Sequence, residues 1–290
     1  MTAVVDHDFL LRPLPAWHPK AWYFAAARGL LHSVGRLSRG IRIGLDHGFD
    51  SGVMLDHVYA NRAEGPGLLG RAIDRAFLNA PGWAGIRNRG RLLETRIVEA
   101  VLERAGRDRP VRLVDLACGG GRYVLGALRR IGDKADLSAT LRDYRGQNVV
   151  KARANAARLG ITATIERGDA FFNGDLARLG GVDVAIVSGL HEIIEDDALV
   201  EAHFRQVARI LAPGGTLLLT VQPDHPQVEF IARVLRSHTG KRWAMRLRPL
   251  DLTRRWLEEA GFVVEDVTME RLGIFGVLRA RKAVDDGDDL

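Results

Sequence analysis

From residue 111 onward, the chain alternates between two patterns that together allow few folds. Short apolar runs such as VRLVD at 111–115 have the length of buried strands, and helical spacing follows, as in RYVLGALRRIG at 122–132. Such alternation places crossover helices on both faces of an open sheet. The last two runs, at 262–271 and 274–282, have no helix between them and should form an antiparallel hairpin. The sequence therefore predicts an α/β fold with a doubly wound, mostly parallel, seven-stranded sheet.

The ends of the chain have a different character. Residues 1–108 look mainly helical, so we expect an N-terminal helical cap in front of a domain at 109–282. Residues 283–290 are rich in aspartate and predict a disordered acidic tail. A single cysteine excludes a disulfide framework. No apolar run reaches the roughly 20 residues of a membrane span, and no signal-peptide pattern is present, so we expect a cytoplasmic protein.

The first predicted strand leads into a glycine-rich loop, DLACGGG at 115–121. Glycine permits a positive φ and lets a ligand approach the backbone, while the start of the next helix favours an anionic group. A dinucleotide-binding fingerprint would need a third glycine where Val124 stands. This mismatch disfavours a nicotinamide-dependent oxidoreductase, which we keep as an alternative.

The same loop resembles motif I of the class I S-adenosylmethionine-dependent methyltransferases, D-x-G-x-G-x-G, with alanine in the first glycine position. Acidic residues follow the second and third strands, and LAPGG at 211–215 is similar to a turn of that family. The resemblance implies a Rossmann-like methyltransferase fold and S-adenosyl-L-methionine as the cofactor. It implies that Asp115 serves the ammonium group, Asp143 the ribose and Asp169 the adenine. The cofactor contacts it implies are Asp115, Ala117, Cys118, Gly119, Gly121, Asp143, Tyr144, Asp169, Ala170 and Ser188.

The fourth predicted strand ends in VSGLHEIIEDD, where the resemblance places the transferred methyl group. His191 is our candidate general base and Glu192 the second candidate, since both side chains can accept a proton. A structural histidine that orients the loop is the alternative reading. The segment lacks the H-E-x-x-H spacing, so no metal site is expected. The N/D-P-P-Y/F signature of enzymes that methylate base amino groups is also missing.

Residues 10–45 contain six basic residues and no acidic one. A helical stripe with arginines opposite it predicts a basic amphipathic helix over 19–42, although glycines at 29, 35 and 40 weaken it. Such a helix can contact an anionic membrane at its inner face or pack on the domain. The stripe consists of Tyr23, Ala27, Leu30, Val34, Leu37 and Ile41.

Residues 47–90, together with 142–149 and 188–194, resemble a narrower group of bacterial methyltransferases, some fused to an α/β-hydrolase domain. A cap of this kind implies that Tyr59 and Arg89 line the acceptor pocket. We therefore predict methyl transfer to an oxygen or nitrogen of a small or lipid-like acceptor. The net charge of +6 keeps an RNA methyltransferase as an alternative, although nucleic acid is not the expected partner. A non-catalytic cofactor-binding module is the remaining alternative.

Overall fold

The computed structural model describes residues 7–106 and 109–284, and the chain forms two compact units. The first unit comprises residues 1–87 and 224–247, and the second comprises residues 88–223 and 248–290. The boundary thus lies at 87/88 where the sequence suggested 108, and the first unit also receives a segment from beyond the fifth strand. The acidic tail expected at 283–290 lies, from residue 285 on, outside the described residues.

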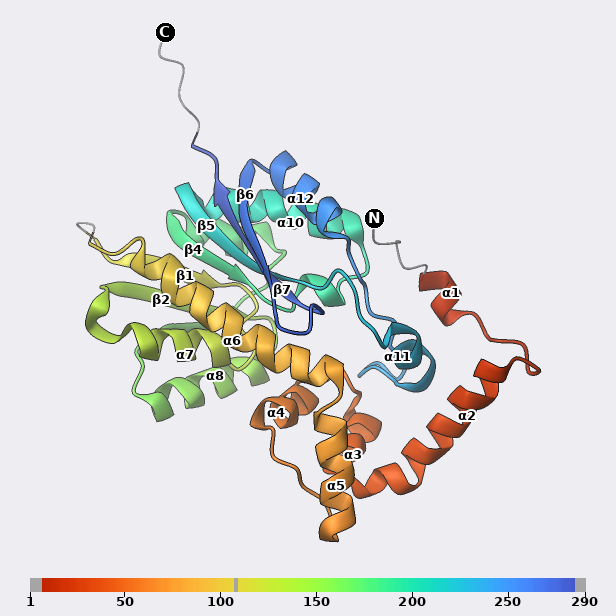
Figure 1. Cartoon of the computed structure of the whole chain (residues 1–290). Coiled ribbons are helices and arrows are strands. Elements are labelled where there is room, and N and C mark those ends of the chain that lie inside the picture. Colours follow the sequence, from red (N-terminus) through yellow and green to blue (C-terminus); the bar gives the residue numbers. More distant parts are fainter. Residues whose placement is uncertain (1–6, 107–108, 285–290) are drawn as a thin grey trace. The chain divides into compact units, whose positions relative to one another are not determined.

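The second unit is built on a seven-stranded sheet with the order β3-β2-β1-β4-β5-β7-β6 (Figure 1). Strands β1 to β5 run parallel, and β7 is antiparallel to both β5 and β6. The predicted doubly wound fold and its closing hairpin are confirmed. The strands are β1 (Val111–Asp115), β2 (Leu137–Asp143), β3 (Thr164–Arg167), β4 (Val182–Val187), β5 (Leu211–Val221), β6 (Phe262–Met269) and β7 (Gly276–Lys282).

Helices cover both faces of this sheet, as strand pleating requires. Successive residues of a strand point to opposite faces, so Leu113 and Val114 of β1 belong to two different apolar clusters. One cluster is closed by α7 (Arg122–Ile131), α8 (Gly146–Leu159) and the C-terminal part of α6 (Pro81–Leu102). The other is closed mainly by α10 (Asp197–Ile210) and α12 (Leu250–Glu259), with the short α9 (Asn173–Leu176).

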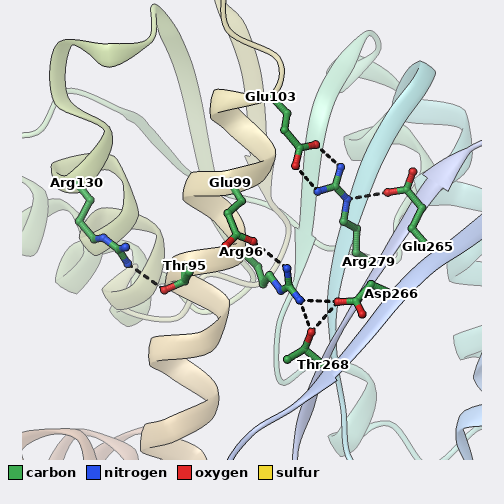
Figure 2. A network of polar contacts seen from close by, with 9 residues as sticks. All are labelled: Thr95, Arg96, Glu99, Glu103, Arg130, Glu265, Asp266, Thr268 and Arg279. Carbon is green, nitrogen blue, oxygen red and sulfur yellow. Dashed lines mark hydrogen bonds and ion pairs between the residues drawn. The ribbon is translucent and has the colours of Figure 1, made fainter.

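The C-terminal part of α6 belongs to the sheet, not to the cap. Leu93 and Ile97 are fully buried in the cluster that α6 shares with α7 and α8. Figure 2 shows ion pairs that fix the same segment to the hairpin: Arg96 donates to Asp266 at 2.6 Å, and Arg279 forms two bonds with Glu103. Because α6 continues as one helix from the first unit into the second, its helical spacing contains no break that could have indicated the unit boundary at 87/88.

The first unit is helical and has its own core. Its helices are α1 (His7–Leu11), α2 (Pro19–His32), α3 (Arg39–His47), α4 (Gly52–Ala60), α5 (Gly67–Leu78), the start of α6, and α11 (Val228–Val234). Phe49, Met54 and Leu78 are buried there together with Ile231 and Leu235 from the segment after β5. The helical cap is therefore completed by 24 residues, 224–247, that sequence reasoning assigned to the sheet domain.

The amphipathic helix predicted over 19–42 is not continuous. Helix α2 ends at His32, a short 3-10 turn follows at Val34–Leu37, and α3 begins at Arg39. Ser38 caps α3, because its Oγ accepts from the Ile41 N–H at 3.0 Å. Of the predicted stripe, Tyr23, Leu30 and Val34 are exposed. Across residues 7–106 and 109–284, no helix combines the length and apolar character that a bilayer crossing requires.

Candidate functional site

The loop after β1 turns on two glycines with positive φ, Gly119 at 55° and Gly121 at 70°. A Cβ on Gly121 would lie 3.0 Å from Leu141 and 3.2 Å from Leu125, so close packing at the start of α7 requires glycine there. A Cβ on Gly119 would meet nothing within 4 Å. Gly121 therefore serves the packing of the loop, whereas Gly119 borders open space that a ligand can enter.

Asp115 is the last residue of β1 and is fully buried. Its Oδ1 accepts the Ala117 N–H at 3.2 Å, but its Oδ2 is buried without a hydrogen-bond partner in the described parts of the chain. Burial raises the pKa of Asp115 to about 8 against the opposing Ala117 N–H, and the Asp143 carboxylate adds to the rise. A buried carboxylate with so few donors is costly unless a cationic ligand pairs with it.

Asp143 ends β2 and holds the glycine loop in place. Its carboxylate accepts N–H groups from Gly119 at 2.8 Å, Arg145 at 2.8 Å and the Asn148 side chain at 3.0 Å. A carboxylate offers about four lone-pair sites, so roughly one remains for a further donor. The residue predicted to bind ribose thus also links the ends of β1 and β2.

Asp169 follows β3 in a loop that is fixed by its neighbours. The Oδ1 of Asp169 accepts the Phe171 N–H at 2.9 Å, and the Asp169 N–H donates to Asp175 at 3.0 Å. The adjacent Ala170 is buried. Asp169 itself is half-buried, and its Oδ1 is engaged with the backbone of the same loop.

A buried arginine that sequence analysis did not single out supports this loop. Arg142 is 1% exposed and donates through Nε to Glu166 at 2.9 Å. Its Nη2 lies 3.6 Å from a carboxylate oxygen of Asp175. A Cβ on Gly168 would lie 2.1 Å from Nη2, so the backbone of the loop rests directly on the guanidinium. No short motif marks Arg142, because its partners come from β3 and α9.

Three further predicted cofactor residues have different surroundings. Ser188 follows β4 and is buried, and its Oγ finds no partner in the residues the structure describes. Cys118 is buried, its Sγ donates to the Gly119 carbonyl at 3.3 Å, and burial raises the pKa of the thiol. Such a thiol is not a nucleophile. Tyr144 is mostly exposed, and its ring centroid lies 5.5 Å from the Arg167 guanidinium.

His191 is packed inward at the end of β4. Its Nε2 lies 2.8 Å from Nδ1 of His203 on α10, and its ring meets Phe204 edge-on. Burial lowers the pKa of His191 well below 6.5, with contributions from His203 and Arg248, so the imidazole is neutral at pH 7. Arg248 donates to the His191 carbonyl at 2.6 Å and fixes the backbone of this turn.

Glu192, the next residue, has hydrogen-bond donors from the described chain at only one of its two carboxylate oxygens. Its Oε1 accepts from Thr220 of β5 at 2.7 Å and from Arg89 of α6 at 3.3 Å. Its Oε2 is buried and accepts no hydrogen bond from the described residues. The Thr220 hydroxyl also accepts the Gly189 N–H at 2.8 Å, which couples β5 to the loop after β4. Thr220 was missed by sequence reasoning because a threonine inside an apolar strand carries no signal of its own.

The structure thus places Asp115, Ser188 and Glu192 at the carboxyl ends of β1 and β4, which are neighbouring parallel strands. Chain order in the sheet reverses between these two strands, where open α/β sheets bind ligands. Each of the three contributes a buried oxygen without a partner in the described chain. Hydrogen-bond donors of a ligand would satisfy them.

The two residues predicted for the acceptor pocket, Arg89 and Tyr59, belong to different units. Arg89 lies in this region, with its guanidinium carbon 4.9 Å from the Phe275 ring centroid. Tyr59 is a half-buried residue of α4 in the first unit, and its role in the acceptor pocket stays a prediction. Within 7–106 and 109–284, no three His, Cys, Asp or Glu side chains are grouped so as to hold a metal ion.

Residues 2–282 match the model of a protein family described as "Putative methyltransferase". The chain belongs to this methyltransferase family. The sequence is also similar to that of the uncharacterized protein YnbC of Escherichia coli K12, with 39% identity over 254 residues. The match covers 86% of this chain but 43% of YnbC, so the chain spans less than half the length of that relative.

Solved structures of low sequence identity share the methyltransferase fold. A Bordetella parapertussis protein described as a "possible exported protein" has a TM-score of 0.57 and 21% identity, covering 93% of this chain and 100% of its own. Magnesium protoporphyrin IX methyltransferase (ChlM) of Synechocystis PCC 6803, solved with S-adenosylhomocysteine, has a TM-score of 0.55 and 15% identity. That match covers 90% of this chain and 99% of ChlM. The sheet thus has the fold of the class I methyltransferases.

Proposed function

We propose that this protein transfers a methyl group from S-adenosyl-L-methionine to an oxygen or nitrogen atom of a small or lipid-like acceptor. The observation that carries the proposal is the buried Oδ2 of Asp115, which has no partner in the described chain and lies beside a glycine loop. The ammonium group of the cofactor is a donor of the right charge for that oxygen, and pairing would offset the cost of burying the carboxylate.

The remaining residues of the site fit the other parts of the cofactor. N–H groups at the start of α7 favour its carboxylate. The open lone-pair site of Asp143 suits a ribose hydroxyl, and the half-buried Asp169 suits the adenine amino group. When bound, the cofactor would supply a methyl group on a positively charged sulfur; a nucleophile that bonds to the methyl carbon breaks its bond to sulfur, and S-adenosylhomocysteine leaves as a neutral thioether. The chain itself has to hold that nucleophile in line and keep water away.

On the acceptor side, Glu192 is better placed than His191 to receive a proton. The Nε2 of His191 is engaged with His203, while its buried Nδ1 has no partner in the described chain. Burial lowers the pKa of His191 well below 6.5, which disfavours a proton on that nitrogen. Glu192 offers its buried Oε2 while Thr220 and Arg89 hold the opposite oxygen. An acceptor that donates a proton, such as a hydroxyl or an amine, matches this arrangement.

A pair of glycine substitutions tests the cofactor site. Gly119→Ala and Gly160→Ala introduce the same methyl group at similar φ values, 55° and 65°, and neither Cβ meets an atom within 4 Å. Each should cost stability by about 1–2 kcal/mol. Gly119→Ala alone should weaken S-adenosylhomocysteine binding, by about tenfold or more in isothermal titration, because its methyl enters the ligand space. Equal affinities of the two variants would refute the proposed site, and so would tight binding of NADH alone.

The acceptor can be sought with methyl-labelled cofactor and a cell extract separated into lipid, RNA, protein and small-molecule fractions. Label in the lipid or small-molecule fraction is expected, and label confined to RNA would instead support an RNA methyltransferase. With the labelled acceptor in hand, Glu192→Gln should lower turnover about 100-fold while cofactor affinity is kept. His191→Asn should lower it less. The reverse order would restore His191 as the base.

A further inference from the structure

Helix α2 turns an uncharged face to the solvent. Its inward side carries the buried Phe24. The lysine and the arginine of α2 bind residues on that same side: Lys20 pairs with Glu229 at 2.7 Å, and Arg28 donates to the Arg233 carbonyl at 2.9 Å. At about 100° per residue, the opposite side of the helix carries six exposed residues without charge. We call them the outer α2 face: Trp22, Tyr23, Ala25, Ala26, Gly29 and Leu30.

The outer α2 face is unusual in what it exposes. Trp22 is 70% exposed, Tyr23 59% and Leu30 62%, and Trp17 just before the helix is 77% exposed. Isolated apolar residues on a surface are ordinary, but exposed aromatic and aliphatic side chains gathered on one helix face mark an interaction site. Tryptophan and tyrosine favour the boundary between bilayer and water, because their rings are amphipathic. Small residues between the rings leave the face flat enough to lie on a surface.

The net positive charge of the molecule is concentrated in the same unit as α2. The first unit contains 15 Lys and Arg residues against 9 Asp and Glu residues, whereas the second contains 27 of each. The whole formal net charge of +6 therefore resides in the first unit. Around α2, exposed arginines stand at positions 12, 36, 39 and 42, and no acidic residue occurs from 10 to 45. Two of them face exposed carboxylates, Arg36 at 3.8 Å from Asp46 and Arg39 in an ion pair with Glu64, which phosphates would have to replace. Basic residues near an anionic bilayer contribute about 1 kcal/mol each to binding.

We propose that the outer α2 face docks on the surface of a bilayer that contains anionic lipids, with Trp22 and Leu30 in the interfacial layer and the neighbouring arginines against the headgroup phosphates. This inference does not rest on the proposed methyl transfer. An anionic bilayer would accept both the apolar side chains of the outer α2 face and the positive charge of the arginines around it.

Charge and orientation disfavour two other occupants. A second copy of the chain seated on this face would bring together two units that each carry a net charge of +6. A nucleic acid is bound through cations that point at phosphates, but the centre of this face is uncharged and Lys20 and Arg28 are engaged inward. A bilayer uses both features, because apolar side chains enter it and flanking cations bind its surface.

Vesicle sedimentation of the full-length protein tests the proposal. Vesicles of equal parts phosphatidylglycerol and phosphatidylcholine are compared with vesicles of phosphatidylcholine alone, at about 0.1 M salt. The double variant Trp22→Ser, Leu30→Ser is compared with Leu68→Ser, Leu69→Ser, which removes another exposed apolar pair, 80% and 61% exposed, from α5 of the same unit. Circular dichroism establishes that both variants are folded.

The natural protein should bind the anionic vesicles and should be released as the salt concentration rises. The α2 variant should bind at least about tenfold more weakly, while the α5 variant should match the natural protein. Equal weakening of both variants, or no binding of the natural protein to anionic vesicles, would overturn the proposal. A dimer in solution that the α2 variant abolishes, without vesicle binding, would assign the face to a second copy. Binding of RNA by the natural protein, without binding of anionic vesicles, would also overturn the proposal.

Discussion

Two fully buried carboxylates, one in each unit, show how differently the two parts of this chain use the same side chain. Asp74 on α5 and Asp115 at the end of β1 both have no solvent exposure. Asp115 accepts a single N–H, from Ala117. Asp74 accepts four hydrogen bonds, from Ser38 Oγ at 2.6 Å, Gly40 N at 2.7 Å, Glu64 N at 2.8 Å and His57 Nε2 at 3.0 Å.

The pKa values of the two groups follow from these partners. Burial by itself would raise the pKa of Asp74, but the donors, led by His57 and Ser38, outweigh it and lower the pKa to about 2. At Asp115 burial prevails and the pKa rises to about 8. A satisfied carboxylate joins the helices of the first unit, whereas an unsatisfied one in the second unit remains available for a ligand.

Removal of the Asp74 charge should have the largest effect on stability. Asp74→Asn keeps the size of the side chain but leaves donors of Ser38, Gly40, His57 and Glu64 facing an amide. The loss should be about 3–5 kcal/mol in the free energy of unfolding, as expected when one partner of a buried charged cluster is removed. Urea unfolding followed by tryptophan fluorescence measures it, since Trp17, Trp22, Trp83 and Trp243 all belong to the first unit.

The matched control is Asp46→Asn, which removes an exposed carboxylate 3.8 Å from Arg36 in the same unit. Its effect should stay below about 0.5 kcal/mol. If Asp74→Asn cost less than about 1 kcal/mol, the distinction between a satisfied and an unsatisfied carboxylate would lose its basis.

The same substitution at Asp115 should act on binding and spare stability. Asp115→Asn should weaken S-adenosylhomocysteine binding by about 1.5–3 kcal/mol, because the ligand ammonium loses a charged acceptor. The unfolding free energy should not fall by more than about 1 kcal/mol, since a buried carboxylate with one donor is already costly to the fold. Titration calorimetry and urea unfolding measure the two quantities, with the exposed Asp133→Asn as the control. Unchanged affinity, or a stability loss like that of Asp74→Asn, would contradict the comparison.

Sequence patterns captured the second unit better than the first for a physical reason. Buried parallel strands, glycine turns and helix spacing are local signals, so the sheet, the turn at 115–121 and the acidic strand ends could be predicted. The additional anchoring role of Asp143 could not, because its donors Gly119, Arg145 and Asn148 become neighbours only when β1 and β2 pair. The Glu192–Thr220 contact likewise joins residues 28 positions apart.

In the first unit, hydrophobic spacing was misleading. The stripe that includes Tyr23 and Leu30 has the periodicity of a core-facing surface, yet the core receives Phe24, which follows Tyr23 in sequence and lies about 100° away from it around the helix. The cluster around Asp74 gives no motif, because it joins residues from four separate segments of the chain. Nor could spacing reveal that residues 224–247 leave the sheet unit and complete the helical core.

The smallest of the expected effects, and the most direct contrast, is in pH dependence. The folded-state pKa of Asp74 lies below its ordinary value of 3.8, so its stabilisation is present above about pH 4 and is lost as the pH falls toward 2. The folded-state pKa of Asp115, about 8, lies above 3.8, so the sign is reversed. Its contribution is fully present below about pH 4 and is lost as the pH rises toward 8.

A cationic ligand reverses that penalty, because it pairs with the ionised form of Asp115. S-adenosylhomocysteine should therefore bind more tightly as the pH rises from 6.5 to 8, by up to about tenfold, since the pKa of about 8 leaves most free protein protonated at the lower pH. In Asp115→Asn the affinity should be independent of pH over this range, which separates Asp115 from any other titrating group. An equally steep rise in the variant would show that the unsatisfied carboxylate at the end of β1 does not receive the ammonium group, and the contrast with Asp74 would then concern stability alone.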